Sequence, residues 1–132
     1  MLSKEQILAA FAVNVSSADG SIEESEIKKI TNVGIVKKLN LDALTKAIKK
    51  EIDSPSDLTE IVMHMTDEDQ QFALFGVLST ALADGKIASK EVLKIHSICD
   101  LFGFGQQPHF ATMLLLRQLK KDPSLQVEGV DF

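Results

Sequence analysis

Apolar residues recur at helical spacing along most of the chain, and no stretch shows the sustained alternation of a half-buried strand. The first periodic stretch follows Ser3, and Gln6 stands three residues later, which is the pattern of a capping box. This helix is expected to end near Ala18. Six further helices are expected to begin near residues 24, 43, 55, 67, 89 and 108. Thr66 and the acidic residues after it are expected to open the fifth helix, and Gly103 is expected to end the sixth. The pattern therefore predicts an all-α protein of about seven helices.

The boundaries around the third helix are predicted from polar residues with known turn preferences. Asn40 is expected to adopt the left-handed conformation that ends the second helix, and Asp42 is expected to cap the third. Ser54 is expected to cap the fourth helix, with Pro55 in its first turn, where the missing N–H is tolerated. Each assignment places a helix boundary at a named residue.

The fifth helix differs from the others because residues 72–83 carry no charge. A helix that is apolar on most sides is expected at the buried centre of a domain. A length of 132 residues suits one domain. We therefore expect a single domain over residues 1–132, with two related helical halves at about 3–52 and 66–120. The stretch 122–132 shows no periodicity and is expected to be an irregular tail.

One short phrase occurs twice, 65 residues apart, and each copy is expected to join two helices. Both copies read A-D-G-x-I-x-x-x-E-[IV]-x-K-I. Gly20 and Gly85 suit the positive φ that ends a helix. If the next helices are capped at Glu23 and Ala88, the surrounding residues fit a tight helix-turn-helix corner.

Two features support this corner. An isoleucine before each cap and an apolar residue four positions into each helix have the spacing of a hydrophobic staple. Glu26 and Glu91 stand at the third helical position, from which a carboxylate can reach back to the backbone of the cap. The staple pairs are Ile22 with Ile27 and Ile87 with Val92.

The phrase also resembles half of an EF-hand calcium loop, which needs oxygen ligands at positions 1, 3, 5, 9 and 12. Val15 occupies position 1 of the first copy, and Leu82 and Ala88 occupy positions 3 and 9 of the second. Aliphatic side chains cannot hold a hard cation, so a true EF-hand is excluded. A different site for Ca²⁺, Mg²⁺ or Mn²⁺ stays open because the phrase keeps hard oxygen donors. The candidate metal residues are Asp19, Glu23, Glu26, Asp84 and Glu91.

These duplicated corners, ADGSIEESE and ADGKIASKE, resemble those of the TerB family of tellurite-resistance proteins. The N-terminal domain of a membrane-anchored DnaJ-like co-chaperone is similar. The resemblance runs roughly from Ser3 to Leu119 and implies an all-helical domain with an internal repeat and no established catalytic activity. It also implies a metal site at four of the candidate residues, Asp19, Glu26, Asp84 and Glu91. The second copy departs from the acidic pattern at residues 88–90.

Charge and composition narrow the classes of partner. The net charge of −5 and the absence of arginine or aromatic residues among the lysines argue against nucleic acid. Residues 27–50 hold seven lysines and one carboxylate, whereas residues 51–69 hold seven carboxylates and no lysine or arginine. Such a dipolar surface can steer a protein partner, and the lysines leave peripheral contact with anionic lipid open. No apolar run approaches the ~20 residues of a membrane span.

The remaining candidate chemistry is sparse. Cys99 is the only cysteine, which is compatible with a cytoplasmic location, and no basic residue flanks it to form a thiolate. In the sequence VMHM, Met65 is expected to face the core and His64 the solvent, which disfavours a soft-metal site. No catalytic motif is present. The leading hypothesis is a non-enzymatic module that acts through protein contacts and needs no cofactor. The resemblance implies a setting in stress or tellurite resistance. The alternatives are a divalent-metal-binding protein and an enzyme without a recognisable motif.

Overall fold

The computed structural model describes residues 2–18, 20–81, 86–87, 89–103 and 126–127. Helices dominate this part of the chain, as the periodicity predicted. The helices are α1 (Lys4–Ser16), α2 (Glu24–Val36), α3 (Leu41–Asp53), α4 (Leu58–Val62), α5 (Asp67–Ala81) and α6 (Ser89–Leu101). The two-residue strands β1 (Lys86–Ile87) and β2 (Gln126–Val127) form one parallel pair.

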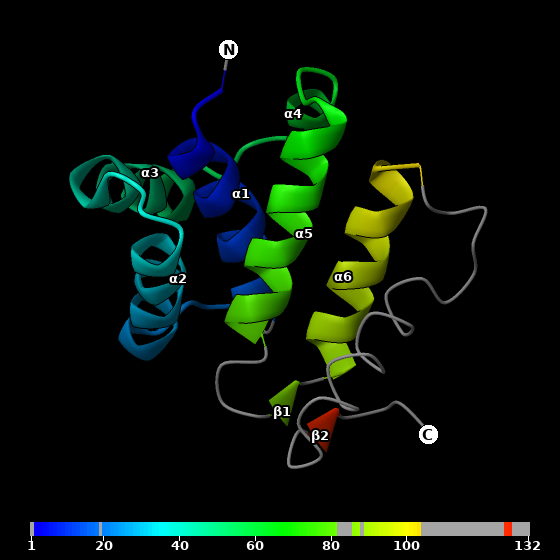
Figure 1. Ribbon diagram of the computed structural model, residues 1–132. Helices are drawn as coiled ribbons and strands as arrows, with labels where there is room; N and C mark the ends of the chain where they lie inside the picture. Colours follow the sequence, from blue (N-terminus) through cyan, green and yellow to red (C-terminus); the bar gives the residue numbers. More distant parts are fainter. Residues whose placement is uncertain (1, 19, 82–85, 88, 104–125, 128–132) are drawn as a thin grey trace.

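Helices α1 and α5 lie side by side at the centre of the described fold (Figure 1). Helices α2 and α3 contact α1 on one side, and α6 contacts both central helices on the other. Buried residues occupy almost the whole length of α1 from Ile7 to Ser16, and α5 is buried over most of its second half. The predicted central position of the uncharged fifth helix is thus confirmed as far as Ala81, and α1 shares that position.

The core consists of two clusters separated by α1. The larger cluster joins α1, α5 and α6 and includes an edge-to-face contact between Phe11 and Phe102, whose ring centroids are 5.4 Å apart. The smaller cluster joins α1 to α2 and α3 around Leu8, Ile30 and Leu44. Because opposite sides of α1 enter different clusters, this helix has to be apolar nearly all round.

Two glycines allow helices to approach closely. A Cβ on Gly76 of α5 would stand 2.5 Å from the Cδ1 atom of Leu8, and a Cβ on Gly34 of α2 would overlap the side chain of Leu44. Leu8 and Leu44 are both fully buried, so neither can move aside freely. The missing side chains therefore set the distances of α5 from α1 and of α3 from α2.

Several predicted helix boundaries are confirmed. Ser3 and Gln6 form the expected capping box of α1. Thr66 and Asp69 exchange reciprocal side-chain to backbone hydrogen bonds of 3.1 Å at the start of α5. Helix α2 begins at Glu24, and Gly103 follows α6 with a φ of 84°.

Two boundaries were predicted wrongly. Lys38, not Asn40, adopts the left-handed conformation, with a φ of 58°. Asn40 is extended and is itself the cap of α3, because its side chain accepts a hydrogen bond from the Ala43 N–H. Ser54 ends α3 instead of starting α4, whose cap is Asp57. Residues 55–57 form a link between these helices.

Three expectations fall partly or wholly beyond the described residues. The seventh helix near residue 108 lies outside them. Of the tail over 122–132, only Gln126 and Val127 are described, and they form β2. The proposed domain limits and repeat halves stay predictions. The all-α class holds, since β1 and β2 contribute two residues each.

Candidate functional site

The first Asp-Gly corner connects α1 to α2. Ser17 caps the end of α1, and Gly20 has a φ of 104°, which suits a residue without a Cβ. Glu23 is extended and precedes the first helical residue of α2, as predicted, but its side chain makes no capping bond. Ile22 and Ile27 are half-buried and both pack against the smaller core cluster. The positive φ and the paired isoleucines support the corner that the sequence predicted.

The second corner is described only in part. Helix α6 begins at Ser89, which agrees with a cap at residue 88, and Val92 is buried in the larger cluster. Gly85 and Ala88 lie outside the described residues, and so does the side chain of Ile87. The predicted equivalence of the two corners therefore stays a prediction.

The candidate metal residues are placed unevenly. Glu23 is exposed before α2, Glu26 is half-buried in the first turn of α2, and Glu91 is half-buried in the first turn of α6. Asp19 and Asp84 lie outside the described residues. Among the residues that the structure describes, no three histidine, cysteine or acidic side chains gather as metal ligands would. The five-residue set stays a prediction.

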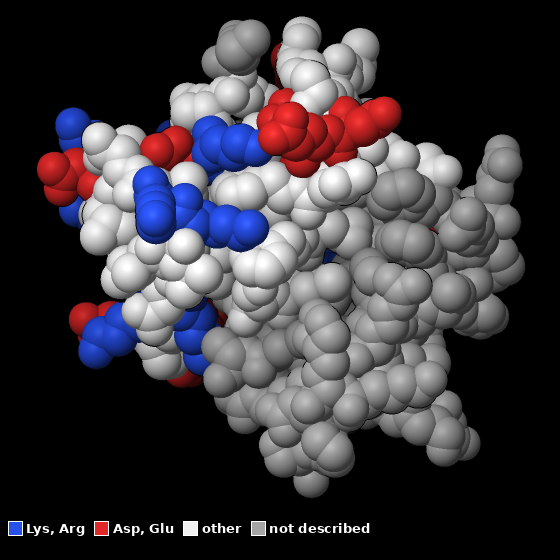
Figure 2. Space-filling model, in the orientation of Figure 1, with Lys and Arg blue, Asp and Glu red and all other residues white. Residues whose placement is uncertain are grey.

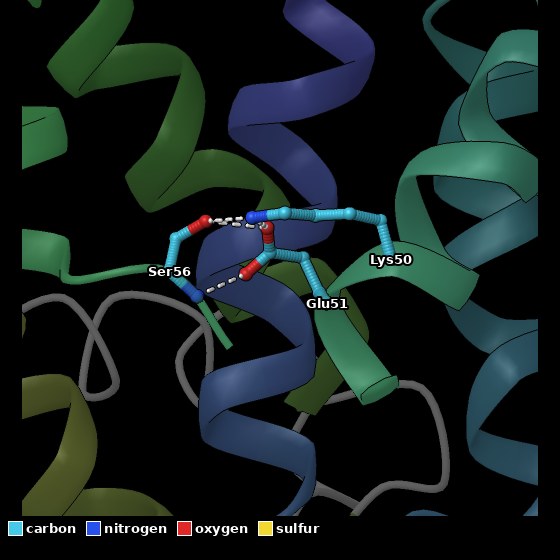
Figure 3. Close-up of polar contacts among 3 residues, drawn as sticks. All are labelled: Lys50, Glu51 and Ser56. Carbon is cyan, nitrogen blue, oxygen red and sulfur yellow. Dashed lines mark hydrogen bonds and ion pairs between the residues drawn. The ribbon is translucent and has the colours of Figure 1, made fainter. Parts of the chain in front are cut away.

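The structure contains a buried carboxylate that was not predicted from the sequence, and Figure 3 shows its polar contacts. Glu51, in the last turn of α3, is only 6% exposed. Its Oε1 accepts a 2.9 Å bond from the Ser56 N–H, and its Oε2 accepts a 2.6 Å bond from the Ser56 hydroxyl. The Lys50 ammonium lies 3.0 Å from Oε2 and 2.6 Å from the Ser56 hydroxyl oxygen. The carboxylate thereby fixes the link between α3 and α4.

The protonation of Glu51 follows from these contacts. Burial by itself raises the pKa of this carboxyl, since it disfavours the charged form. The hydroxyl and amide of Ser56 and the charge of Lys50 act in the opposite direction, and the net result is a pKa below the ordinary value of 4.5. Glu51 is therefore ionised near neutral pH, and both of its carboxylate oxygens have partners.

A serine, a lysine and a glutamate in mutual contact also suggest nucleophilic catalysis. A lysine activates a serine as a general base only when it is desolvated and can give up its proton. The Lys50 side chain is 57% exposed, so it is not desolvated, and its ammonium forms an ion pair with Glu51. The Ser56 hydroxyl donates its hydrogen to the Glu51 carboxylate and accepts a hydrogen bond from Lys50. The arrangement therefore fits a structural clamp better than a catalytic group.

We call the contacts among Lys50, Glu51 and Ser56 the Glu51 clamp. Two cavities border it. One has a volume of about 330 Å³ and extends from Glu51 and Ser56 to Gly20 and Ile22 of the first corner. The other, of about 500 Å³, lies between the start of α1 and the lysines of α3. The first corner and the buried carboxylate thus line the same cavity, although they lie about 30 residues apart in the sequence.

A different kind of surface lies between α2 and α5. We call it the α2–α5 slot; it is a cavity of about 220 Å³ lined by Lys29, Asn32, Val33, Val36, Phe75 and Ser79. Val36 is 70% exposed and Phe75 is 41% exposed, so two apolar side chains face solvent at one place. The Lys37 ammonium lies 3.9 Å from the centre of the Phe75 ring, a cation–π contact. The slot is therefore an apolar depression with basic edges.

Other candidate groups are inert. Cys99 is buried, and this burial, aided by the charge of Asp100, raises the pKa of its thiol to about 11. It is a packing residue and not a nucleophile. Met65 packs against the larger cluster and His64 is exposed, as predicted. Met63 is 78% exposed beside them.

Part of what was missed left a signal in the sequence. Glu51 stands three residues after Ile48 and seven after Leu44, so it continues the buried face of α3. A carboxylate at such a position needs a partner, which local spacing could have suggested. The α2–α5 slot left no comparable signal, because its two walls are about 40 residues apart in sequence.

Comparison with known protein families agrees with this architecture. A family model described as "Tellurite resistance protein TerB" matches residues 5–113, which is most of the chain. The protein therefore belongs to the TerB family, as the duplicated corners suggested. Neither the search of curated proteins nor the search of solved structures gave a match. In the described part of the chain, no helix has the length and apolar character needed to cross a membrane.

Proposed function

We propose that this TerB-family protein is a non-enzymatic helical module that acts by binding a protein partner at the α2–α5 slot. The observation that carries the proposal is the exposure of Val36 and Phe75 around an apolar depression. Exposed apolar groups that gather at one place and are rimmed by polar ones are typical of interaction sites. The described residues show no competing catalytic arrangement, since Cys99 and the Glu51 clamp both have structural roles.

The charges around the slot indicate the partner's chemistry. Lys37 borders Phe75, and Lys28 and Lys38 are exposed on the same helix and its end. Figure 2 shows a group of basic side chains around the turn that follows α2, whereas acidic and basic side chains lie together at the start of this helix. A partner with carboxylates around an apolar anchor would be steered to this site by charge and held by burial. The partner is therefore an acidic, amphipathic protein segment.

Chemical-shift mapping with a designed peptide tests this function. The peptide is an amphipathic helix with one leucine anchor flanked by glutamates, added to the full chain labelled with ¹⁵N. We expect shifts concentrated at residues 32–37 and 75–79, and their loss in Val36→Asp. The matched control is Leu93→Asp, because Leu93 is 65% exposed on α6, away from the slot. Shifts elsewhere, or none, contradict the proposal.

The physiological setting is proposed from the family alone. The family description supports a role in tellurite resistance or a related stress response, in the cytoplasm or at a membrane surface. A strain lacking this protein should grow poorly on tellurite and recover with the wild-type chain but not with Val36→Asp at equal abundance. Full recovery by that variant would separate the slot from the phenotype.

A second candidate function is divalent-cation binding at the first corner. The observation that favours it is the cavity that joins Gly20 and Ile22 to Glu51, because this cavity places a buried carboxylate close to the corner. The ligands would be Asp19, Glu23 and Glu26, with Asp84 and Glu91 at the second corner. At 100 times its dissociation constant an ion should stabilise the fold by about 2.7 kcal/mol. Melting with Ca²⁺, Mg²⁺ and Mn²⁺ tests this, and Asp19→Asn should remove the effect more fully than Asp84→Asn.

A further inference from the structure

We infer that the α2–α5 slot receives Met63 from a second copy of this chain, so that the protein forms a dimer. The inference rests on the proposed function and names the occupant of the same site. It starts from a second exposed feature, at the end of α4, whose chemistry is complementary to that of the slot.

Met63 is 78% exposed, the highest value among the large apolar side chains that the structure describes as exposed. It stands between Glu60 of α4 and the acidic first turn of α5, where Asp67 and Glu68 are exposed. Methionine is unbranched and flexible, so it adapts to an irregular depression. We call this feature the Met63 knob. It is an apolar anchor surrounded by carboxylates, which is the chemistry that the slot requires.

The size of the slot favours a single side chain as its occupant. Small-molecule sites usually measure about 300–1,000 Å³, and the slot is smaller, at about 220 Å³. Its floor is apolar, and its edge carries Lys29 and the nearby Lys37. An inserted methionine would meet Val36 and Phe75, while the flanking carboxylates would meet the lysine ammonium groups.

The Met63 knob cannot fill the slot of its own chain. Eight helical residues separate Asp67 from Phe75 along α5, which corresponds to roughly 12 Å at the rise of an α-helix. Met63 precedes the start of α5. Two residues later, Met65 packs against the core and anchors this part of the chain. The contact therefore has to form between two molecules.

The positions of the slot and of the Met63 knob allow a symmetric dimer. Acidic side chains over the start of α5 and basic side chains over α2 are visible on the same face of the molecule (Figure 2). A two-fold axis between two complementary patches on one face places the Met63 knob of each copy against the slot of the other copy. The contact is then made twice, and the assembly ends at a dimer.

Each copy has a net charge of −5, which opposes association at long range. Salt screens this repulsion beyond about 8 Å at physiological ionic strength, whereas the contacts between lysines and carboxylates are much shorter. We therefore expect dimer formation at physiological salt and weaker association near 1 M salt, where screening reaches about 3 Å.

Sedimentation velocity of the full chain over a range of concentrations tests the inference. We expect a monomer–dimer equilibrium that weakens at least tenfold in Met63→Ser and in Val36→Asp. Lys37→Glu and Glu60→Lys should each weaken it by a similar factor, and the chain that carries both reversals should recover most of the affinity. Leu93→Asp serves as the control and should leave the equilibrium unchanged. Circular dichroism melting must show each variant folded.

The outcomes separate this inference from the proposed function. A chain that stays monomeric at the highest concentration overturns the dimer, and so does a dimer that persists in Met63→Ser and Val36→Asp. If the chain is monomeric but the acidic peptide still shifts slot resonances, the proposed function stands and only the second copy is excluded. Binding of vesicles with anionic lipid, lost in Val36→Asp and without dimer formation, overturns both in favour of a membrane surface.

Discussion

The Glu51 clamp and the α2–α5 slot are opposite in character. The clamp places a charged group where solvent is nearly absent, and Ser56 and Lys50 meet its two oxygens. The slot places the apolar groups Val36 and Phe75 where solvent is present. Both depart from the ordinary arrangement of polar groups outside and apolar groups inside.

The difference shows how each departure is stabilised. At Glu51 the cost of burial is offset within the same chain, since hydrogen bonds from Ser56 hold the ionised form. At the slot, Lys37 covers one ring and Val36 stays largely exposed. A departure compensated internally indicates a structural role, whereas one left exposed indicates a site for another molecule. This contrast between the clamp and the slot can be tested by substitution and by pH.

The largest effect is expected for Glu51→Ala. The substitution leaves the Ser56 amide and hydroxyl without their acceptor and frees the link between α3 and α4. Hydrogen bonds to charged groups contribute about 1.5–3 kcal/mol, so the free energy of unfolding should fall by roughly 2–3 kcal/mol. Urea unfolding measures the loss. Asp53→Ala, an exposed change two residues later, is the control and should be nearly neutral. If Glu51→Ala changed the free energy of unfolding as little as Asp53→Ala, Glu51 would have no structural role.

A smaller loss is expected on acidification. The pKa of Glu51 is lower in the folded chain than the ordinary value of 4.5, so folding favours the ionised form. This contribution is complete above pH 4.5 and disappears as the pH falls from 4.5 through the lowered folded pKa. Wild type should lose stability relative to Glu51→Gln within that window, because glutamine does not titrate. Parallel curves for the two proteins, measured by urea unfolding at each pH, would contradict the clamp.

An effect of about 1 kcal/mol is expected for Gly20→Ala at the border of the same cavity. A Cβ there meets no atom within 4 Å, so the cost comes from the φ of 104° and not from a clash. Thermal melting should show the loss, whereas Ser25→Ala, exposed in the first turn of α2, serves as the control. Gly85→Ala should behave like Gly20→Ala if the two corners are equivalent. A neutral result at residue 20 would contradict the strained corner.

The smallest effect on stability is expected for Val36→Ser in the slot. Surface substitutions usually change stability by less than about 0.5 kcal/mol. Val33→Ser, one turn earlier in α2, places a hydroxyl in the core and should cost roughly 1–3 kcal/mol. The contrast sharpens if Val36→Ser keeps the melting temperature and still loses peptide binding. A large stability loss at Val36 would instead make the slot part of the core.

The features that could be predicted from the sequence are those that depend on residues within about one helical turn. The caps at Ser3 and Thr66, the start of α2 and the end of α6 each rest on such local pairs, and the structure confirms them. The uncharged stretch of α5 predicted its central position, and the duplicated corners led to the TerB family. The error at Asn40 arose because a left-handed residue and a helix cap favour the same side chain.

The helices that meet and the groups that stay exposed could not be predicted from local patterns, because both depend on the tertiary packing. Leu8 fits over Gly76 although 68 positions separate them in the chain, and Val36 of α2 lines the same depression as Phe75 of α5. Ser56 leaves the expected helix because its amide and hydroxyl bind Glu51. Such contacts depend on the packing of all the helices at once. A local pattern can state that a residue is apolar or charged, but only the surrounding helices determine whether it is covered.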